Sequence, residues 1–261
     1  MPTDSTGVPR PDTAPQPVAL APGLPLDRLQ SRFAATGRVH VPGVLAPGGA
    51  ERLHDALRRD IGWQTAFRHG NRQEGGRHVD LSREQVALLD RTRLGLLADA
   101  VNAQARSSFA YVYNSFPIAD TAPRPDRPDS PGHRAVYALF DFLNRAPFLE
   151  FVRQLTGLDR IARADAQATL FHAGHFLTTH DDDVPGQDRL AAYVLNLTPS
   201  WSIDWGGLLA FHGADGHVAE AFTPSFNALN LFKVPMRHCV TYVAPFCPAG
   251  RYSITGWLRS A

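Results

Sequence analysis

The chain has 261 residues and a mass of 28.6 kDa, which is enough for one large domain with a sizeable buried core. Its 26 Lys and Arg residues nearly balance its 25 Asp and Glu residues, and a net charge of +1 argues against nucleic-acid or membrane partners. Two cysteines cannot form a disulfide framework, and we find neither a leader pattern nor a long apolar run, so we expect a cytoplasmic protein.

The N-terminal half of the chain is predicted to be mainly helical. Residues 1–25 hold seven prolines and almost no large apolar side chain, so we expect a flexible tail there. Amphipathic spacing and end signals then predict four helices, and alternating apolar residues predict two short strands. The helices are expected over 26–36, 49–60, 82–105 and 134–156, and the strands over 39–44 and 109–113.

Two local patterns mark boundaries in this half. Ser82 and Gln85 have the spacing of a capping box, which predicts the start of the third helix. The segment from Pro117 to Pro131 holds five prolines together with Asp and Arg, which predicts a long exposed loop.

The C-terminal half has the pattern of a β domain. Short apolar runs are separated by Gly, Pro and Asp, at a spacing typical of successive strands in a sandwich or barrel. We therefore predict one domain, 26–261, of the mainly β class with N-terminal helices. Residues 166–261 form a double-stranded β-helix, or jelly roll, supported by residues 26–165. The eight strands are expected over 168–172, 175–179, 190–197, 207–211, 217–222, 228–232, 239–244 and 253–258.

A candidate metal site begins at the end of the second of these strands. His180 and Asp182 form an H-x-D pair, and His238 opens a later strand 58 residues on. Two imidazoles and one carboxylate on a rigid sheet make the facial triad that holds Fe(II) and leaves open positions for oxygen and a chelating co-substrate. An H-x-D pair alone is a weak signal, because Asp181 and its neighbours also fit a solvated acidic turn.

A candidate anion site lies on the last strand. Arg251 and Ser253 are two residues apart, so a guanidinium and a hydroxyl face the same side of that strand. Such a pair can bind a carboxylate by charge-assisted hydrogen bonds. The alternative is a surface arginine in a salt bridge, but the order of H-x-D, distal histidine and R-x-S favours the anion site.

The run from Phe171 to Leu258 resembles the catalytic core of the iron(II)/2-oxoglutarate dioxygenases, in particular the prolyl-hydroxylase branch. It is most similar to the eukaryotic prolyl hydroxylases that act on a ribosomal protein, and the helical half is similar only loosely. The segments that carry the resemblance are His180-Asp181-Asp182, Trp205-Gly206-Gly207-Leu208, Ser225-Phe226-Asn227 and Arg251-Tyr252-Ser253-Ile254-Thr255-Gly256-Trp257.

The resemblance implies a role for each matching residue. His180, Asp182 and His238 would bind Fe(II), while Arg251 and Ser253 would bind the distal carboxylate of 2-oxoglutarate. Arg189 matches a position where these hydroxylases often carry an arginine near the substrate.

Two departures from the family pattern concern the co-substrate. Positions where relatives often place a tyrosine carry Asn196 and Phe171, so Asn196 becomes a candidate co-substrate contact and the contacts are expected to be rearranged. The eukaryotic enzymes also carry a second, degenerate barrel, for which this chain is too short.

The sequence therefore predicts an Fe(II)- and 2-oxoglutarate-dependent dioxygenase that uses O2 to hydroxylate a C–H bond. By resemblance, the substrate is a prolyl residue in a protein or peptide. Two alternatives stay open: a hydroxylase of a free amino acid or small biosynthetic intermediate, and a cupin-like metal-binding or sensing module without turnover.

Other conspicuous side chains receive structural interpretations. Phe109, Tyr111 and Tyr113 alternate on a predicted strand, and we expect them to pack in the core rather than line a groove. His172 and His175 are left without a role because three protein ligands suffice for iron.

Overall fold

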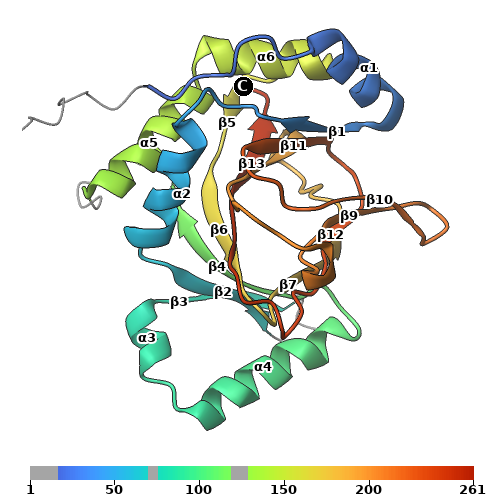
Figure 1. Ribbon diagram of the computed structural model, residues 1–261. Helices are drawn as coiled ribbons and strands as arrows, with labels where there is room; N and C mark the ends of the chain where they lie inside the picture. The colour runs from blue at the N-terminus through green and yellow to red at the C-terminus, as the bar shows by residue number, and fades with distance from the viewer. Residues whose placement is uncertain (1–16, 70–75, 119–128) are drawn as a thin grey trace, which may run out of the picture.

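One antiparallel β-sheet curls towards a closed barrel and has helices packed on its outside (Figure 1). The computed structural model describes residues 17–69, 76–118 and 129–261. Within these residues the strand order is β1-β11-β8-β13-β6-β4-β7-β12-β9-β10, with β2 added to β4, β3 added to β2, and β5 added to β13. The strands are β1 (Arg38–Pro42), β2 (Gln64–His69), β3 (Arg77–Leu81), β4 (Tyr111–Pro117), β5 (Arg163–Ala164), β6 (Gln167–Phe171), β7 (Phe176–His180), β8 (Arg189–Asn196), β9 (Leu209–His212), β10 (Val218–Phe222), β11 (Ala228–Lys233), β12 (His238–Val240) and β13 (Arg251–Arg259).

The predicted jelly-roll class is confirmed, and all eight strands expected after residue 166 are present. Their limits differ mostly by one or two residues, except that β12 is shorter and β13 begins earlier. Sequence reasoning missed β5 and the β2–β3 hairpin, whose strands are short and mix polar with apolar residues.

Six α-helices lie in the described residues. Two predicted helices are divided in the structure: Asp90 caps a new helix after α3, and Pro147 lies in the first turn of α6. The Ser82–Gln85 capping box is present as predicted. The helices are α1 (Leu26–Thr36), α2 (Gly49–Arg59), α3 (Arg83–Ala87), α4 (Arg91–Ala105), α5 (Pro131–Leu143) and α6 (Ala146–Thr156).

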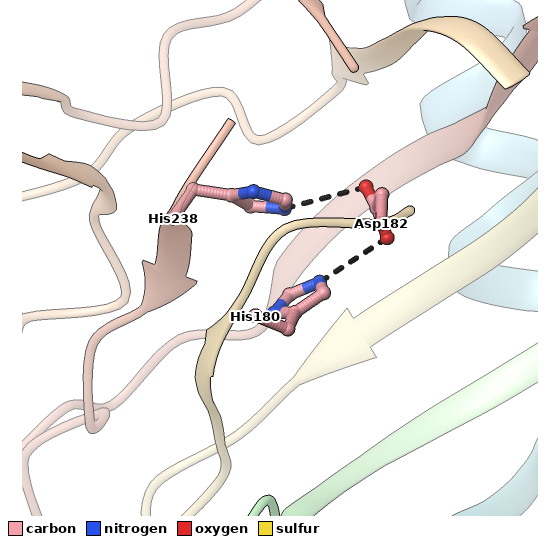
Figure 2. Close-up of side chains that lie close together, drawn as sticks. All are labelled: His180, Asp182 and His238. Carbon is pink, nitrogen blue, oxygen red and sulfur yellow. Dashed lines mark ion pairs between the residues drawn. The ribbon is translucent and has the colours of Figure 1, made fainter. Parts of the chain in front are cut away.

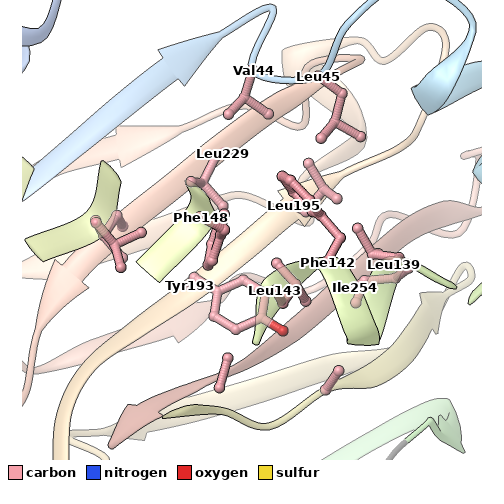
Figure 3. Packing of buried hydrophobic residues seen from close by; sticks show 14 of the residues in the cluster. Val44, Leu45, Leu139, Phe142, Leu143, Phe148, Tyr193, Leu195, Leu229 and Ile254 are labelled. Carbon is pink, nitrogen blue, oxygen red and sulfur yellow. The ribbon is translucent and has the colours of Figure 1, made fainter. Parts of the chain in front are cut away.

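Strand β8 shows how the sheet separates its two faces. Tyr193 and Leu195 point outwards into the main core, where they meet α5, α6 and other strands (Figure 3). Ala192 and Val194 point to the opposite face, the interior of the barrel. The helices therefore stabilise the sheet from outside and leave its inner face free to form a site.

The two segments expected to be irregular are only partly described. Residues 1–16 of the expected tail and residues 119–128 of the Pro-rich loop lie outside the described residues. Residues 17–25, by contrast, lie against the core: Leu20 packs there, and the Ala21 amide donates to the Val44 carbonyl at 2.9 Å. The expected flexible tail is therefore wrong for residues 17–25, because the apolar side chains near Leu20 find a surface to cover.

No helix among the described residues combines the length and apolar character that crossing a membrane requires.

Candidate metal and co-substrate site

A cavity of about 410 Å³ opens inside the barrel. Strands β4, β6, β7, β8, β12 and β13 contribute its walls, and the loop after β7 lies at its edge. The cavity contains all three predicted metal ligands together with Arg189 and Arg251. It therefore brings together five of the seven predicted site residues.

His180, Asp182 and His238 converge on one point of this cavity (Figure 2). The Nε2 atoms of His180 and His238 lie 3.4 and 3.5 Å from the two carboxylate oxygens of Asp182. The side chains are 18%, 8% and 5% exposed for His180, Asp182 and His238, so the cluster is largely shielded from water while the cavity stays open beside it. This is the only group of three or more potential metal ligands within the described residues.

Backbone hydrogen bonds orient both imidazole rings. The Nδ1 atom of His180 lies 3.0 Å from the Thr178 carbonyl oxygen, and that of His238 lies 2.7 Å from the Met236 carbonyl oxygen. A carbonyl only accepts, so each Nδ1 carries the proton and each Nε2 keeps its lone pair towards Asp182. The rings are thus held in the tautomer that a metal ion requires.

The protonation states of the cluster also suit a divalent cation. Burial acts to raise the pKa of Asp182, but the neighbouring His180 and His238 side chains outweigh it and leave the pKa lowered. Burial, together with the neighbouring His180, lowers the pKa of His238 to about 4. At neutral pH the cluster therefore offers a carboxylate and a neutral imidazole, and its two-histidine, one-carboxylate composition fits Fe(II).

Asp182 reaches the cavity through a turn in the backbone. β7 ends at His180, and Asp182 then adopts a φ of 64°, in the left-handed region that residues other than glycine rarely occupy. The Arg189 guanidinium donates to the Asp182 carbonyl at 3.0 Å and supports this conformation. Strand alternation correctly predicted that Asp182 lies beside His180. The Asp182 carboxylate reaches the cavity, however, because the backbone turns there and Arg189 supports that turn.

Arg251 lies in the cavity wall with almost no exposure, 1%, and has no acidic partner among the described residues. Its Nε atom is buried without a hydrogen-bond partner, and its Cζ lies 5.2 Å from the Phe171 ring centroid. Burial lowers the pKa of Arg251 to about 10, so the side chain remains charged at neutral pH. A buried, unpaired cation facing a cavity is a site for an anion.

Ser253 and Asn196 are not brought to the cavity. The Ser253 hydroxyl lies 2.8 Å from that of Thr169, and the Asn196 amide nitrogen lies 3.3 Å from the Ala228 carbonyl. Both residues are completely buried and neither lines the cavity. The Asn196 amide already donates within the sheet, whereas either hydroxyl of the Thr169–Ser253 pair can be the donor. The predicted contacts of Ser253 and Asn196 with the co-substrate stay predictions.

The expectation that Phe109, Tyr111 and Tyr113 pack in the core rather than line a groove is wrong, because all three line the cavity. The alternation of these residues indicated that their side chains share one face of a strand. It does not reveal whether that face packs in a core or lines a site. Sequence reasoning also left out Gln167, which lines the same wall.

Trp257 lines the cavity beside Arg189. The Cζ atom of Arg189 lies 3.5 Å from the Trp257 ring centroid, a stacked cation–π contact. The structure thus places Arg189 next to the metal-binding cluster. Its predicted contact with a substrate stays a prediction.

His172 and His175 contact each other, with ring centroids 5.7 Å apart, and neither lines the cavity. This position agrees with leaving them without a role at the metal.

Comparison with protein families places a match over residues 166–259, to the family described as the 2OG-Fe(II) oxygenase superfamily. The matched segment contains β6 to β13 and therefore every predicted site residue. The resemblance seen in the sequence is confirmed.

Two curated relatives carry the same name, prolyl 3-hydroxylase OGFOD1. The protein of Mus musculus is 32% identical over 117 residues, which cover 42% of this chain and 21% of the relative. The protein of Xenopus laevis is 29% identical over 119 residues, covering 43% and 23%. The chain thus aligns with only about a fifth of the length of these relatives.

Solved structures with the same fold cover most of the chain. A prolyl-4-hydroxylase of Pseudomonas putida matches with a TM-score of 0.53 at 17% identity, covering 90% of this chain and 99% of the other. A prolyl hydroxylase of Trichoplax adhaerens, solved with a peptide fragment of the hypoxia inducible factor oxygen degradation domain, matches with a TM-score of 0.56 at 15% identity, covering 90% and 88%. At these identities the likeness concerns the fold.

Proposed function

We propose that this chain, which carries a 2OG-Fe(II) oxygenase domain at residues 166–259, is a 2-oxoglutarate-dependent dioxygenase that hydroxylates a prolyl residue of a protein or peptide. The observation that carries the proposal is the convergence of His180, Asp182 and His238 on a cavity that also contains the buried, unpaired Arg251. A metal cluster alone would suit many functions, and a buried cation alone would suit any anion. Together they fit a site for a metal ion and a carboxylate ligand.

In this proposal His180, Asp182 and His238 bind Fe(II) with two Nε2 atoms and one carboxylate. When bound, Fe(II) with 2-oxoglutarate and O2 supplies the oxidant for an unactivated C–H bond. The backbone carbonyls at Thr178 and Met236 keep the two rings in the ligating tautomer. Only three protein ligands are present in the cluster, so room is left for the co-substrate.

Arg251 binds the distal carboxylate of 2-oxoglutarate in this proposal. The guanidinium is planar and has five N–H donors, which suits a carboxylate better than any other side chain does. Because the cavity wall excludes water from Arg251, a charge-assisted hydrogen bond there is stronger than on a surface.

A prolyl substrate is favoured by the wall that Arg189 and Trp257 form next to Asp182. A flat, aromatic surface with a guanidinium packed on it suits the apolar ring and backbone carbonyl of a prolyl residue. The curated relatives and several solved structures of the same fold are also named prolyl hydroxylases. Asp181 and Asp183 lie at the cavity and are the groups that would instead pair with the ammonium of a free amino acid.

The test uses iron-loaded protein with 2-oxoglutarate, offered separately to proline-containing peptides, cell lysate, free L-proline and other free amino acids. We expect succinate formation and a +16 Da product on a peptide or protein, with Asp182→Ala as the inactive control. Turnover of a free amino acid without any hydroxylated polypeptide would refute the prolyl substrate. Absence of succinate under all conditions would refute the oxygenase and favour a binding module.

We also propose that the protein works in the cytoplasm. Its two cysteines, Cys239 and Cys247, are both unpaired, which suits a reducing compartment. Cell fractionation with an antibody to the protein tests this location.

A further inference from the structure

The two histidine ligands lie on neighbouring strands, β7 and β12, and the pairing of these strands is irregular beside them. His238 pairs with His180, and Val240 pairs with Leu177. One residue of β12 therefore faces two residues of β7, which is the count of a β-bulge. Because β12 is only three residues long, the bulge lies directly next to its metal ligand. The backbone ladder alone therefore does not hold the two ligands firmly at one separation.

The bulge consists of Thr178 and Thr179 in β7, opposite Cys239 in β12. Thr178 is held by the residue that precedes β4, because its amide and its hydroxyl each donate to the Ala110 carbonyl at 3.0 Å. The Thr178 carbonyl in turn lies 3.0 Å from His180 Nδ1, as described above. The first residue of the bulge is therefore fixed from the side of β4.

Thr179 and Cys239 lie on the outer face of the sheet, away from the metal cluster. Neither lines the cavity inside the barrel, and both line a second cavity of about 330 Å³, which residues of α4 border. Packing therefore restrains the two strands less here than where side chains fill the space against them. A side-chain link between the strands has the most to contribute at such a point.

His212, in β9, makes this link. Its Nε2 atom lies 3.3 Å from Thr179 Oγ1 and 3.3 Å from Cys239 Sγ. A hydroxyl and a thiol can each donate or accept, so each suits an imidazole nitrogen in either tautomer. Thr179 is the residue before His180, and Cys239 is the residue after His238. The His212 ring thus bridges the two strands directly behind the two ligands.

The separation of the two ligands is what a metal ion requires to be fixed. The His180 and His238 rings have centroids 4.2 Å apart, and both Nε2 atoms face Asp182. A functional site must hold its groups within about 0.5 Å of the productive geometry. Movement of β12 against β7 at the bulge changes the separation of the rings directly. A residue outside the cluster can therefore influence metal affinity through the strands that carry the ligands.

We propose that His212 is a positioning residue for the metal site. Its bridge between Thr179 and Cys239 fixes the separation of the two histidine ligands. This inference rests on the proposed function, because it requires a metal ion bound by those histidines and Asp182. His212 neither lines the cavity nor belongs to the cluster of potential ligands.

The test measures metal affinity without turnover. Co(II) is titrated into the metal-free protein under anaerobic conditions in competition with a chelator, and the visible absorption of bound Co(II) reports its coordination geometry. We expect His212→Ala to weaken Co(II) binding roughly ten-fold and to change this spectrum, because residues that orient metal ligands contribute on this scale. His212→Gln places an amide nitrogen near the position of Nε2 and should restore most of the affinity and the spectrum. His217 is exposed in the turn between β9 and β10, so His217→Ala is the control and should change neither.

A double-mutant cycle tests the bridge itself. A protein with Thr179→Val and Cys239→Ala should also bind Co(II) roughly ten-fold more weakly, and adding His212→Ala to it should cause no further loss. This protein also carries the test if His212→Ala alone does not fold, which thermal unfolding of each metal-free variant establishes.

Each other outcome has a definite meaning. Unaltered affinity in His212→Ala, an equal loss in His217→Ala, or full additivity in the cycle overturns the role of His212 while the metal site stands. If Asp182→Ala binds Co(II) as tightly as the unaltered protein, the metal site itself fails, and the proposed function and this inference fall together.

Discussion

The Arg189 guanidinium lies over the Trp257 ring, with Cζ 3.5 Å from the ring centroid, while it donates a hydrogen bond to the Asp182 carbonyl. Arg189 therefore connects the aromatic wall of the cavity to the turn that directs the Asp182 carboxylate towards the two histidines. Lysine cannot reproduce this arrangement, because it lacks the planar face and the second donor direction.

We predict that Arg189→Lys weakens metal binding by about ten-fold, although Arg189 is not a ligand. Residues that orient a metal ligand typically contribute ten- to hundred-fold to affinity. The measurement is a competition titration of Mn(II) or Fe(II) with a chelator under anaerobic conditions. Arg259→Lys is the control, since Arg259 bonds Asp165 and Gln187 outside the cavity and should leave metal affinity unchanged.

Replacing Asp182 by Ala should abolish stoichiometric metal binding, because it removes the carboxylate that faces both Nε2 atoms. Asp181→Ala and Asp183→Ala should lower affinity only slightly, since neither joins the cluster of potential ligands. Metal content after gel filtration, measured by mass spectrometry, separates the three variants. Equal loss from Asp181→Ala and Asp182→Ala would contradict the assignment.

The sequence predicts the metal cluster and the barrel well, because both depend on local patterns. An H-x-D pair at a strand end and the alternation of side chains along β8 depend on neighbouring residues in the sequence and not on what the strands pack against. Tyr113 and Gln167 are different: they line the same cavity because β4 pairs with β6, a contact between segments about fifty residues apart that no local pattern specifies. The contact of Ser253 with Thr169 likewise depends on strand pairing, here of β13 with β6, and the predicted contact of Ser253 with the co-substrate stays a prediction.

The metal-free protein should lose stability as the pH falls from 6.5 towards 4, in part through His238. Burial lowers its pKa from 6.5 to about 4 in the folded state, so the unfolded chain takes up the proton first. A group with a depressed folded pKa contributes stability above its unfolded pKa and loses it as the pH falls, by up to about 1.4 kcal/mol per pH unit. Urea unfolding between pH 7 and 4.5 measures the slope.

His175 also has a pKa lowered to about 4 by burial, so the prediction concerns the difference between two proteins. His238→Gln should show a shallower loss of stability with falling pH than the unaltered chain. Parallel curves for both proteins would mean that His238 is not buried in its neutral form.

Gly256→Ala should destabilise the protein by about 2 kcal/mol or more. A Cβ atom at this position in β13 would meet the Asp165 carbonyl oxygen and lie 2.9 Å from the Tyr193 ring. The backbone cannot yield easily, because the Asp165 carbonyl accepts from Tyr193 and its side chain accepts from the Trp257 amide. Gly95→Ala in α4 meets no atom within 4 Å and should stabilise by about 0.5–1 kcal/mol. Urea unfolding at pH 7 compares the two variants.

Arg251→Met should separate the ligand role of Arg251 from any role in folding. Arg251 is a buried charge without an acidic partner among the described residues, so the metal-free protein gains nothing from it and should unfold at a similar or higher temperature once it is replaced. Methionine fills most of the space and avoids a cavity.

The same variant should no longer be stabilised by 2-oxoglutarate. In the unaltered protein loaded with Zn(II), 2-oxoglutarate at a hundred times its Kd adds about 2.7 kcal/mol to the free energy of unfolding. A ten- to hundred-fold loss of affinity in Arg251→Met removes about 1.4 kcal/mol or more of that gain, which thermal unfolding with and without ligand detects. Arg259→Met is the matched control: its ion pair with Asp165 lies outside the cavity, so it should lower the unfolding temperature and keep the full ligand effect. An undiminished shift in Arg251→Met would show that the carboxylate binds elsewhere.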